Sequence, residues 1–159
     1  MGLRGYSIVN GVPIQYFSVG IQDDDRRILE LSDTQLSASQ QALKALAMLV
    51  ALRQWFPHWC SVRSAVTVRS DNTGTLAAVA RMQPKSRVLG IISRELALDI
   101  ASATYDPEIL HIPGVANLAA DILSRRYEPS RGSFALPPTL DRASEITVSP
   151  RDSNWWKSL

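Results

Sequence analysis

The chain has 159 residues, enough for one domain with a hydrophobic core, and 45% of its residues are hydrophobic. Its 17 basic and 15 acidic residues give a net charge of +2, too small to predict nucleic-acid binding by itself. Cys60 is the single cysteine, which excludes an intrachain disulfide and a cysteine zinc cluster. The sequence shows no signal peptide and no apolar run long enough to cross a bilayer. We therefore expect an intracellular protein, in the cytoplasm, the nucleus or an organelle, with no membrane partner.

The first 31 residues predict three antiparallel strands. Residues 6–9 lead into Asn10-Gly11, a strong two-residue hairpin signal, and residues 12–19 alternate and return. Residues 23–25 are three aspartates, which predict a solvated polar turn rather than a metal site, because adjacent side chains in a turn diverge. Residues 26–31 then predict the third strand.

Helical periodicity dominates the middle of the chain. Apolar residues recur at helical spacing over residues 37–55, and Pro57 ends this helix. Residues 65–68 form a short apolar run, partly β-branched, which predicts a central strand that stops at Ser70-Asp71. The remaining predicted elements are helices over residues 73–81 and 86–103, a strand over 108–112 and a helix over 116–125.

This order of elements predicts an α/β fold. We expect a mixed five-stranded sheet, with three antiparallel strands and then parallel ones, and helices on both faces. Residues 1–126 form the expected domain. From Tyr127 onward the sequence is polar and interrupted by prolines, so residues 127–159 predict a C-terminal tail or linker that drapes over the domain. Trp155 and Trp156 could anchor this tail or pack on a protein partner.

The most specific pattern runs from His111 to Arg125. His111 ends a short strand, a Pro-Gly turn follows, and Asn117 precedes Asp121 by one helical turn, so these side chains are expected around one edge of a cleft. The pattern reads His-x-Pro-Gly-x-x-Asn-x-x-Ala-Asp-x-Leu-Ser-Arg. Together with the upstream Ser-Asp-Asn around Asp71, it resembles the ribonuclease H domains of retroelement (LTR- or DIRS-like) reverse transcriptases, over about residues 2–126.

The resemblance implies a ribonuclease H-like fold that cuts the RNA strand of an RNA–DNA hybrid. In that family four carboxylates hold two divalent cations, Mg²⁺ or Mn²⁺, which clamp the scissile phosphate. Asp71 and Asp121 match two of these catalytic, metal-binding carboxylates, and His111 matches the assisting histidine. The candidate substrate-binding residues are Asn72, Asn117, which matches an asparagine of the family pattern, and Arg87, near a joint between helices that can touch the hybrid backbone.

Two of the four expected carboxylates are missing. Residues 45–52 align without a gap with the family's first-helix run, and the position of the family's glutamate holds Lys44. Residues 2–8 resemble the second half of the family's first-strand stretch, whose aspartate would fall upstream of Met1. At about 4 Å and an effective dielectric near 20, each unit charge is worth about 4 kcal/mol, so a cation here repels metal. We expect Lys44 to pair with Asp71 or Asp121 and to keep the old site folded without metal.

Three functions remain open on the sequence. The first is a nuclease, which we expect to be weak or inactive as the chain is written. The second is a catalytically dead, domesticated module that needs no cofactor and binds nucleic acid or other protein subunits, the latter through the tail. The third, an integrase-type transferase on the same fold, is disfavoured by the pattern of residues 111–125. Simpler interpretations also exist: Asp71-Asn72 could cap a helix, and Asp121 and His111 could be ordinary exposed residues.

Overall fold

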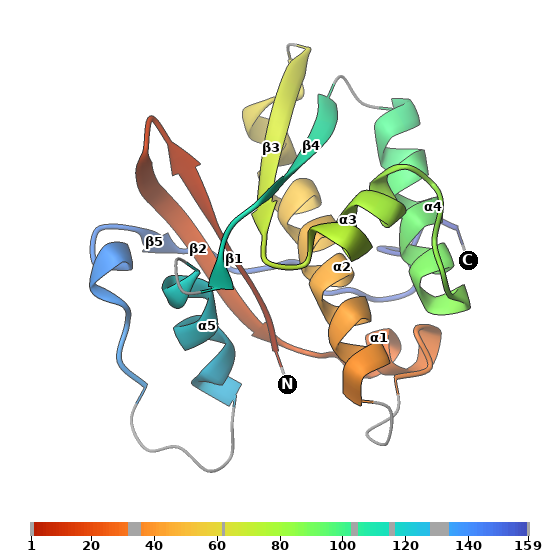
Figure 1. Cartoon of the computed structure of the whole chain (residues 1–159), viewed down its shortest axis with the longest axis horizontal. Helices are drawn as coiled ribbons and strands as arrows, with labels where there is room; N and C mark the ends of the chain where they lie inside the picture. Colours follow the sequence, from red (N-terminus) through yellow and green to blue (C-terminus); the bar gives the residue numbers. More distant parts are fainter. Residues whose placement is uncertain are drawn as a thin grey trace.

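The computed structural model describes residues 2–31, 36–61, 63–102, 105–114, 117–127 and 134–158. Within these residues the chain has a mixed α/β fold of five strands and five α-helices (Figure 1). The predicted α/β class is therefore confirmed. The strands form two separate sheets, β1-β2-β5 and β3-β4, so the predicted single five-stranded sheet is wrong.

A hairpin begins the first sheet. Strands β1 (Gly2–Val9) and β2 (Val12–Gly20) pair in antiparallel fashion, as the sequence predicts. The turn residues Asn10 and Gly11 have φ angles of 52° and 80°, the left-handed conformation that tight hairpins require and that asparagine and glycine tolerate best. The short strand β5 (Ser144–Glu145) comes from the C-terminal tail and pairs in parallel with β2.

The predicted third strand over residues 26–31 is wrong, because helix α1 (Asp23–Ile28) includes residues 26–28 and a turn follows it. The helix has three aspartates in its first turn and two arginines in its last turn, a distribution that complements the helix dipole. A reciprocal capping box between Gln22 and Asp25 fixes its start. Asp25 is also fully buried, so the expectation of a solvated turn does not hold for this carboxylate.

The predicted helices are present. Among the described residues, helix α2 (Leu36–Trp55) supplies the largest share of the main hydrophobic core, which also contains Leu3 of β1 and Phe17 of β2. A single 3₁₀ turn, η1 (Phe56–His58), follows α2 at the predicted proline. The other α-helices are α3 (Thr73–Ala80), α4 (Arg87–Ser102) and α5 (Leu118–Ser124), and α5 continues into the 3₁₀ turn η3 (Arg125–Tyr127).

The second sheet consists of β3 (Ser64–Ser70) and β4 (Tyr105–His111), which pair in parallel with Ser64 opposite Tyr105 and Ser70 opposite His111. β3 was expected in the centre of a sheet. Instead it lies at an edge, and its residues alternate between half-buried and exposed. The apolar run of residues 65–68 therefore lacks the two-sided cover that such runs usually have.

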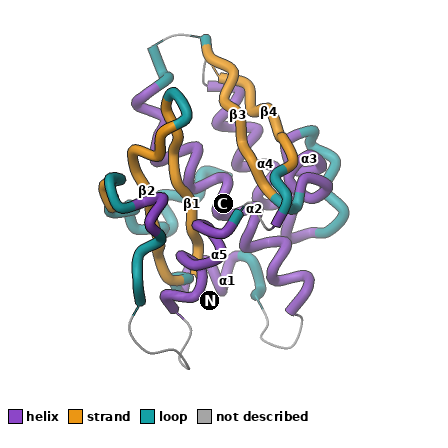
Figure 2. The backbone as a smooth tube through the Cα atoms, turned by 60° about the vertical axis from the view of Figure 1, so that its left-hand side comes forward, coloured by secondary structure: helices purple, strands orange, loops and turns teal. Residues whose placement is uncertain are grey.

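Helices pack against both sheets. α2 packs against β1, and α3 and α4 lie on the far side of α2 (Figures 1 and 2). α5 covers the other face of the β1–β2 hairpin, where Tyr16, Leu123 and Leu140 form a second, smaller core. Among the described residues, no helix combines the length and apolar character that crossing a membrane requires.

The described part of the C-terminal tail packs into the domain. It contributes β5 and the 3₁₀ turn η4 (Pro138–Leu140), and Trp156 is only 2% exposed, so of the two alternatives for this residue the structure shows the anchor. Arg151 and Asp25 form a salt bridge in which both side chains are 0% exposed. Arg53 of α2 also holds the tail, because its Nη1 donates to the Trp155 carbonyl at 2.7 Å. Residues 128–133 of the predicted tail lie outside the described residues.

Candidate functional site

A cleft of about 1370 Å³ lies between the two sheets. β1 lines one wall, β3 lines the other, and α2 forms the floor. The carboxyl end of β3 and the amino end of β1 lie at the same end of this cleft, because the two strands run in opposite directions (Figure 1). Three charged residues line this end of the cleft, and each comes from a different part of the fold: Arg4 from β1, Lys44 from α2 and Asp71 from the end of β3. We call the group formed by Arg4, Lys44, Asp71, Asp121 and Arg125 the charged cluster.

Lys44 and Asp71 form an ion pair across the cleft floor. The Lys44 Nζ lies 3.0 Å from Asp71 Oδ1 and 2.9 Å from Oδ2. The two side chains are 34% and 37% exposed, so water still reaches the pair. The predicted ion pair of Lys44 is therefore confirmed. Of the two acids that the sequence offered as its partner, Asp71 forms the pair.

The ion pair lowers the pKa of Asp71. Partial burial acts to raise the pKa of this carboxyl, but the hydrogen bond and the charge of Lys44 outweigh it, with a smaller contribution from Arg4. The pKa of Asp71 is therefore lowered, and the carboxylate is ionised at neutral pH. A carboxylate that is already paired through both oxygens is a poor remaining ligand for a metal ion.

Arg4 is a member of the cluster that the sequence did not reveal. Burial lowers the pKa of its guanidinium, and the charges of Asp121 and Asp71 act in the opposite direction. Arg4 therefore lies within electrostatic reach of both candidate carboxylates. Strand alternation could have placed Arg4 on the face of β1 opposite the buried Leu3, but the sequence does not show that α5 covers that face.

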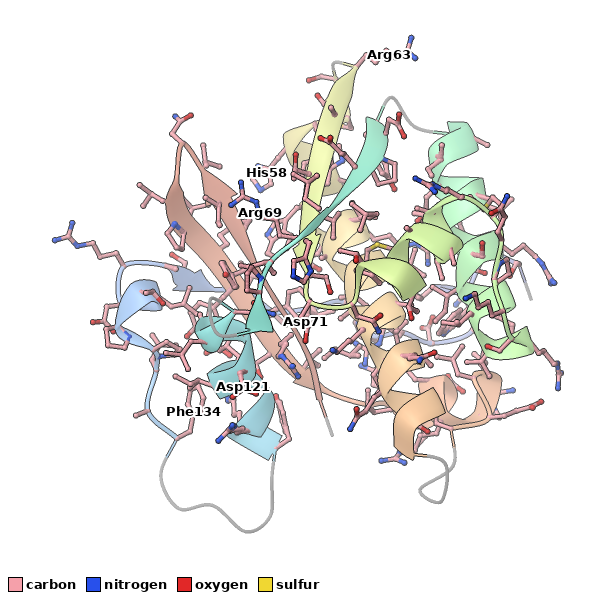
Figure 3. All side chains as sticks on the ribbon, viewed as in Figure 1. His58, Arg63, Arg69, Asp71, Asp121 and Phe134 are labelled. Carbon is pink, nitrogen blue, oxygen red and sulfur yellow. The ribbon has the colours of Figure 1, made fainter. Side chains whose placement is uncertain are left out.

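Asp121 is also paired with a cation. Its Oδ2 lies 2.7 Å from Nη2 of Arg125, one turn later on the same helix, and the Asp121 side chain is 46% exposed. Figure 3 shows Asp121 on α5 and Asp71 at the end of β3. Among the described residues there is no group of three or more His, Cys, Asp or Glu side chains that could hold a metal ion. The residues present do not fit the pair of divalent cations that the resemblance implies.

The other candidate residues fall into two sets. The Ser70 carbonyl oxygen accepts a hydrogen bond from the Ile112 amide at 3.0 Å, which extends the β3–β4 pairing past His111, but His111 itself is exposed and is not among the described residues that line the cleft. Asn117 begins α5 and lines the cleft. Arg87 is outside this group: it begins α4, pairs with Glu30 and is not among the described residues that line the cleft.

Asn72 has a structural role. It is the N-cap residue of α3, and its side chain accepts a hydrogen bond from the Thr75 amide at 3.4 Å. The capping interpretation is thus confirmed for Asn72, whereas Asp71 bonds to Lys44 instead. Residues 115 and 116 of the His-to-Arg pattern lie outside the described residues.

Two further basic residues line the cleft and were not predicted. Arg69 lies on the exposed face of β3, and His58 ends the 3₁₀ turn after α2; both extend toward the space between the sheets (Figure 3). The strand pattern alone does not predict that Arg69 lines a cleft, because an arginine at an alternating strand position usually faces solvent.

No protein-family model, curated protein or solved structure matches this chain. Its function must therefore be inferred from the charged cluster and the cleft themselves. The arrangement can bind anions and polar backbone groups, and it lacks a set of free carboxylates for metal-assisted hydrolysis among the described residues.

Proposed function

We propose that this chain is a ribonuclease H-like domain of retroelement reverse-transcriptase origin that no longer cleaves RNA–DNA hybrids and instead binds nucleic acid without metal. The observation that carries the proposal is the ion pair between Lys44 and Asp71. An ammonium group bonds to both oxygens of the carboxylate that would otherwise be a metal ligand.

The charge balance of the cluster supports loss of the metal site. Two carboxylates face three cations, those of Arg4, Lys44 and Arg125, so the cluster carries net positive charge. A divalent cation entering this site would meet repulsion from each of them. At an effective dielectric near 20, one such contact at about 4 Å costs about 4 kcal/mol per pair of unit charges before solvent screening reduces it.

The same charge balance favours an anionic ligand. Arginine side chains bind phosphate oxygens with a planar pair of N–H groups, and phosphate contacts supply most of the affinity of non-specific nucleic-acid binding. Arg125 is 39% exposed and so remains accessible to a ligand. The competing proposal, a protein partner bound through the tail, is less well supported. Trp156 is buried within this chain, and the Trp155 ring stacks with Arg53.

Two assays test the proposal. A fluorescent 12-base-pair RNA–DNA hybrid should bind the chain in EDTA, and no cleavage should follow when Mg²⁺ or Mn²⁺ is added. Titration calorimetry should detect no tight Mn²⁺ binding by the unaltered chain but measurable binding by Lys44→Glu, which restores an acid beside Asp71. Metal-dependent cleavage or tight metal binding by the unaltered chain would refute the proposal.

A matched pair of variants locates the bound nucleic acid. Arg125→Gln should weaken hybrid binding and reduce its salt dependence by about one counterion. Arg94→Gln removes the same charge from an exposed position on α4 outside the charged cluster, and should leave the affinity unchanged. Equal effects of the two substitutions would mean that binding depends on net charge alone and not on the charged cluster.

A further inference from the structure

The two walls of the cleft are open edges of β-sheets. β1 pairs with β2 and β3 pairs with β4, and within the described residues neither β1 nor β3 has a strand on its other side. Those other sides line the cleft. An open edge presents a row of unpaired N–H and C=O groups, which makes it a template for another strand. Here two such edges face one another across a single cleft.

The directions of β1 and β3 define how one strand could join both. β1 runs from the N-terminus toward the hairpin turn, whereas β3 runs the opposite way, from Arg63 to Asp71 (Figures 1 and 3). A strand between them that runs with β3 would be parallel to β3 and antiparallel to β1. β3 has seven residues and β1 has eight, so the edges match in length. A seven-residue strand spans about 23 Å.

The surface of the cleft indicates the side chains that such a strand would carry. α2 contributes Ala47, Ala51 and Leu52 to the floor, and Val66 and Val68 of β3 are only half-buried beside it. The side of an inserted strand that faces α2 would therefore be apolar. The buried Trp59 Nε1 and Ser7 Oγ, which both belong to cleft-lining residues, have no hydrogen-bond partner among the described residues.

The opposite side of an inserted strand would meet positive charge. Arg4 lies on the face of β1 away from the buried Leu3, and Arg69 lies on the face of β3 away from Val66 and Val68. Acidic side chains between these two arginines would form cross-strand pairs of opposite charge, which stabilise sheets.

We propose that the cleft is an acceptor site for one extended peptide strand of about seven residues, apolar toward α2 and acidic on its other face, which joins the two sheets into one. The strand completes the hydrogen bonding of β1 and β3 and covers Val66 and Val68. This proposal rests on the open edges of the cleft and does not depend on nucleic-acid binding at Asp121 and Arg125.

A designed peptide tests the acceptor site. The probe is a fluorescent seven-residue peptide of alternating valine and glutamate, added to the full chain. Anisotropy should show saturable binding, and hydrogen exchange should show new protection of amides in both β1 and β3. The same peptide with alternate backbone nitrogens methylated keeps its side chains but loses half of its edge donors, and it should bind at least about tenfold more weakly.

Reversing the charge of Arg69 tests whether the side of the bound strand that faces away from α2 is acidic. Arg69→Glu should weaken binding of the valine–glutamate peptide by about tenfold and should improve binding of the matching valine–lysine peptide. Arg94→Glu, on α4, should change neither. Rescue by the lysine peptide also shows that the Arg69 variant is folded.

Several results would overturn the acceptor site. These are no peptide binding at millimolar concentration, equal binding of the methylated peptide, and protection confined to one of the two sheets. Self-association of the chain with protection of β1 and β3 would show that a second copy fills the cleft instead. Protection of both strands by the RNA–DNA hybrid, with displacement of the peptide, would assign the cleft to nucleic acid. A hybrid that binds without protecting β1 and β3 and without displacing the peptide would instead support an acceptor site separate from the nucleic-acid site.

Discussion

Replacing Arg151 with methionine should strongly destabilise the fold. Arg151 Nε lies 3.1 and 2.9 Å from the two carboxylate oxygens of Asp25, and its Nη2 lies 2.7 Å from Asp25 Oδ2 and 2.9 Å from the Gly20 carbonyl oxygen. Both side chains are 0% exposed. After the substitution, the buried Asp25 carboxylate keeps the hydrogen bond from the Gln22 amide, at 3.0 Å, but loses the charge of its buried arginine partner. Leaving such a charge unpaired costs about 3–5 kcal/mol, a large part of the stability of a typical domain.

Urea denaturation followed by tryptophan fluorescence measures this cost, because the tail carries Trp155 and Trp156. The double variant Arg151→Met, Asp25→Leu should recover most of the loss, since neither charge remains buried alone. Arg142→Met, at an exposed position of the same tail, is the control and should stay within about 0.5 kcal/mol of the unaltered chain. A loss below about 1 kcal/mol for Arg151→Met would refute the docking of the tail against α1.

Two further predictions concern the cluster and the hairpin. Because the pKa of Asp71 is lowered in the folded chain, the pair with Lys44 stabilises the fold above the unfolded-state pKa of about 3.9, and this contribution is lost as the pH falls through the lower folded-state value. An NMR titration should therefore show a higher Asp71 pKa in Lys44→Met than in the unaltered chain, and an unchanged pKa would contradict the pairing. Gly5→Val should cost about 1–3 kcal/mol in urea denaturation, because a Cβ at Gly5 would lie 2.8 Å from the Phe17 ring. Gly74→Ala, in α3 with open space around it, should instead add about 0.4–1 kcal/mol, so the same sign for both glycine substitutions would rule out this steric explanation.

The parts of the fold that the sequence predicted are those with local causes. Asn10-Gly11 tolerates the left-handed backbone of a tight turn, so the hairpin follows from two residues and their flanks. α2 follows from the helical spacing of its apolar residues and from the proline that ends it. Each of these signals lies within about 20 residues, which is the range that periodicity can cover.

α1 was missed although its signal was local. Three aspartates precede two arginines, which is the charge order that a helix dipole favours, and Gln22 and Asp25 form the capping box. The apolar residues Ile28 and Leu29 drew the interpretation toward a strand. The role of Asp25 depends on Arg151, 126 residues away, and no local pattern carries that information.

The division into two sheets could not be predicted, because it depends on which edges find partners. β3 has the composition of a central strand, yet only β4 pairs with it in the described residues. β5 has two residues and no strand pattern, and its pairing with β2 follows from the path of the tail. In the site, the resemblance to a family pattern predicted that Lys44 lies beside an acid. The position of Arg4 near Asp71 and Asp121 could not be predicted, because it depends on the packing of α5 against β1.

The charged cluster and the open cleft are physically linked through Arg4. This arginine lies within electrostatic reach of Asp71 and Asp121, and it also stands on the edge strand that would receive the acidic peptide. Arg4 is thus both one of the cations that would repel a divalent metal and one of the two arginines that would attract an acidic strand. Acidic side chains bound beside Arg4 would compete with Asp71 for its charge, so peptide binding and the protonation of Asp71 must influence one another reciprocally.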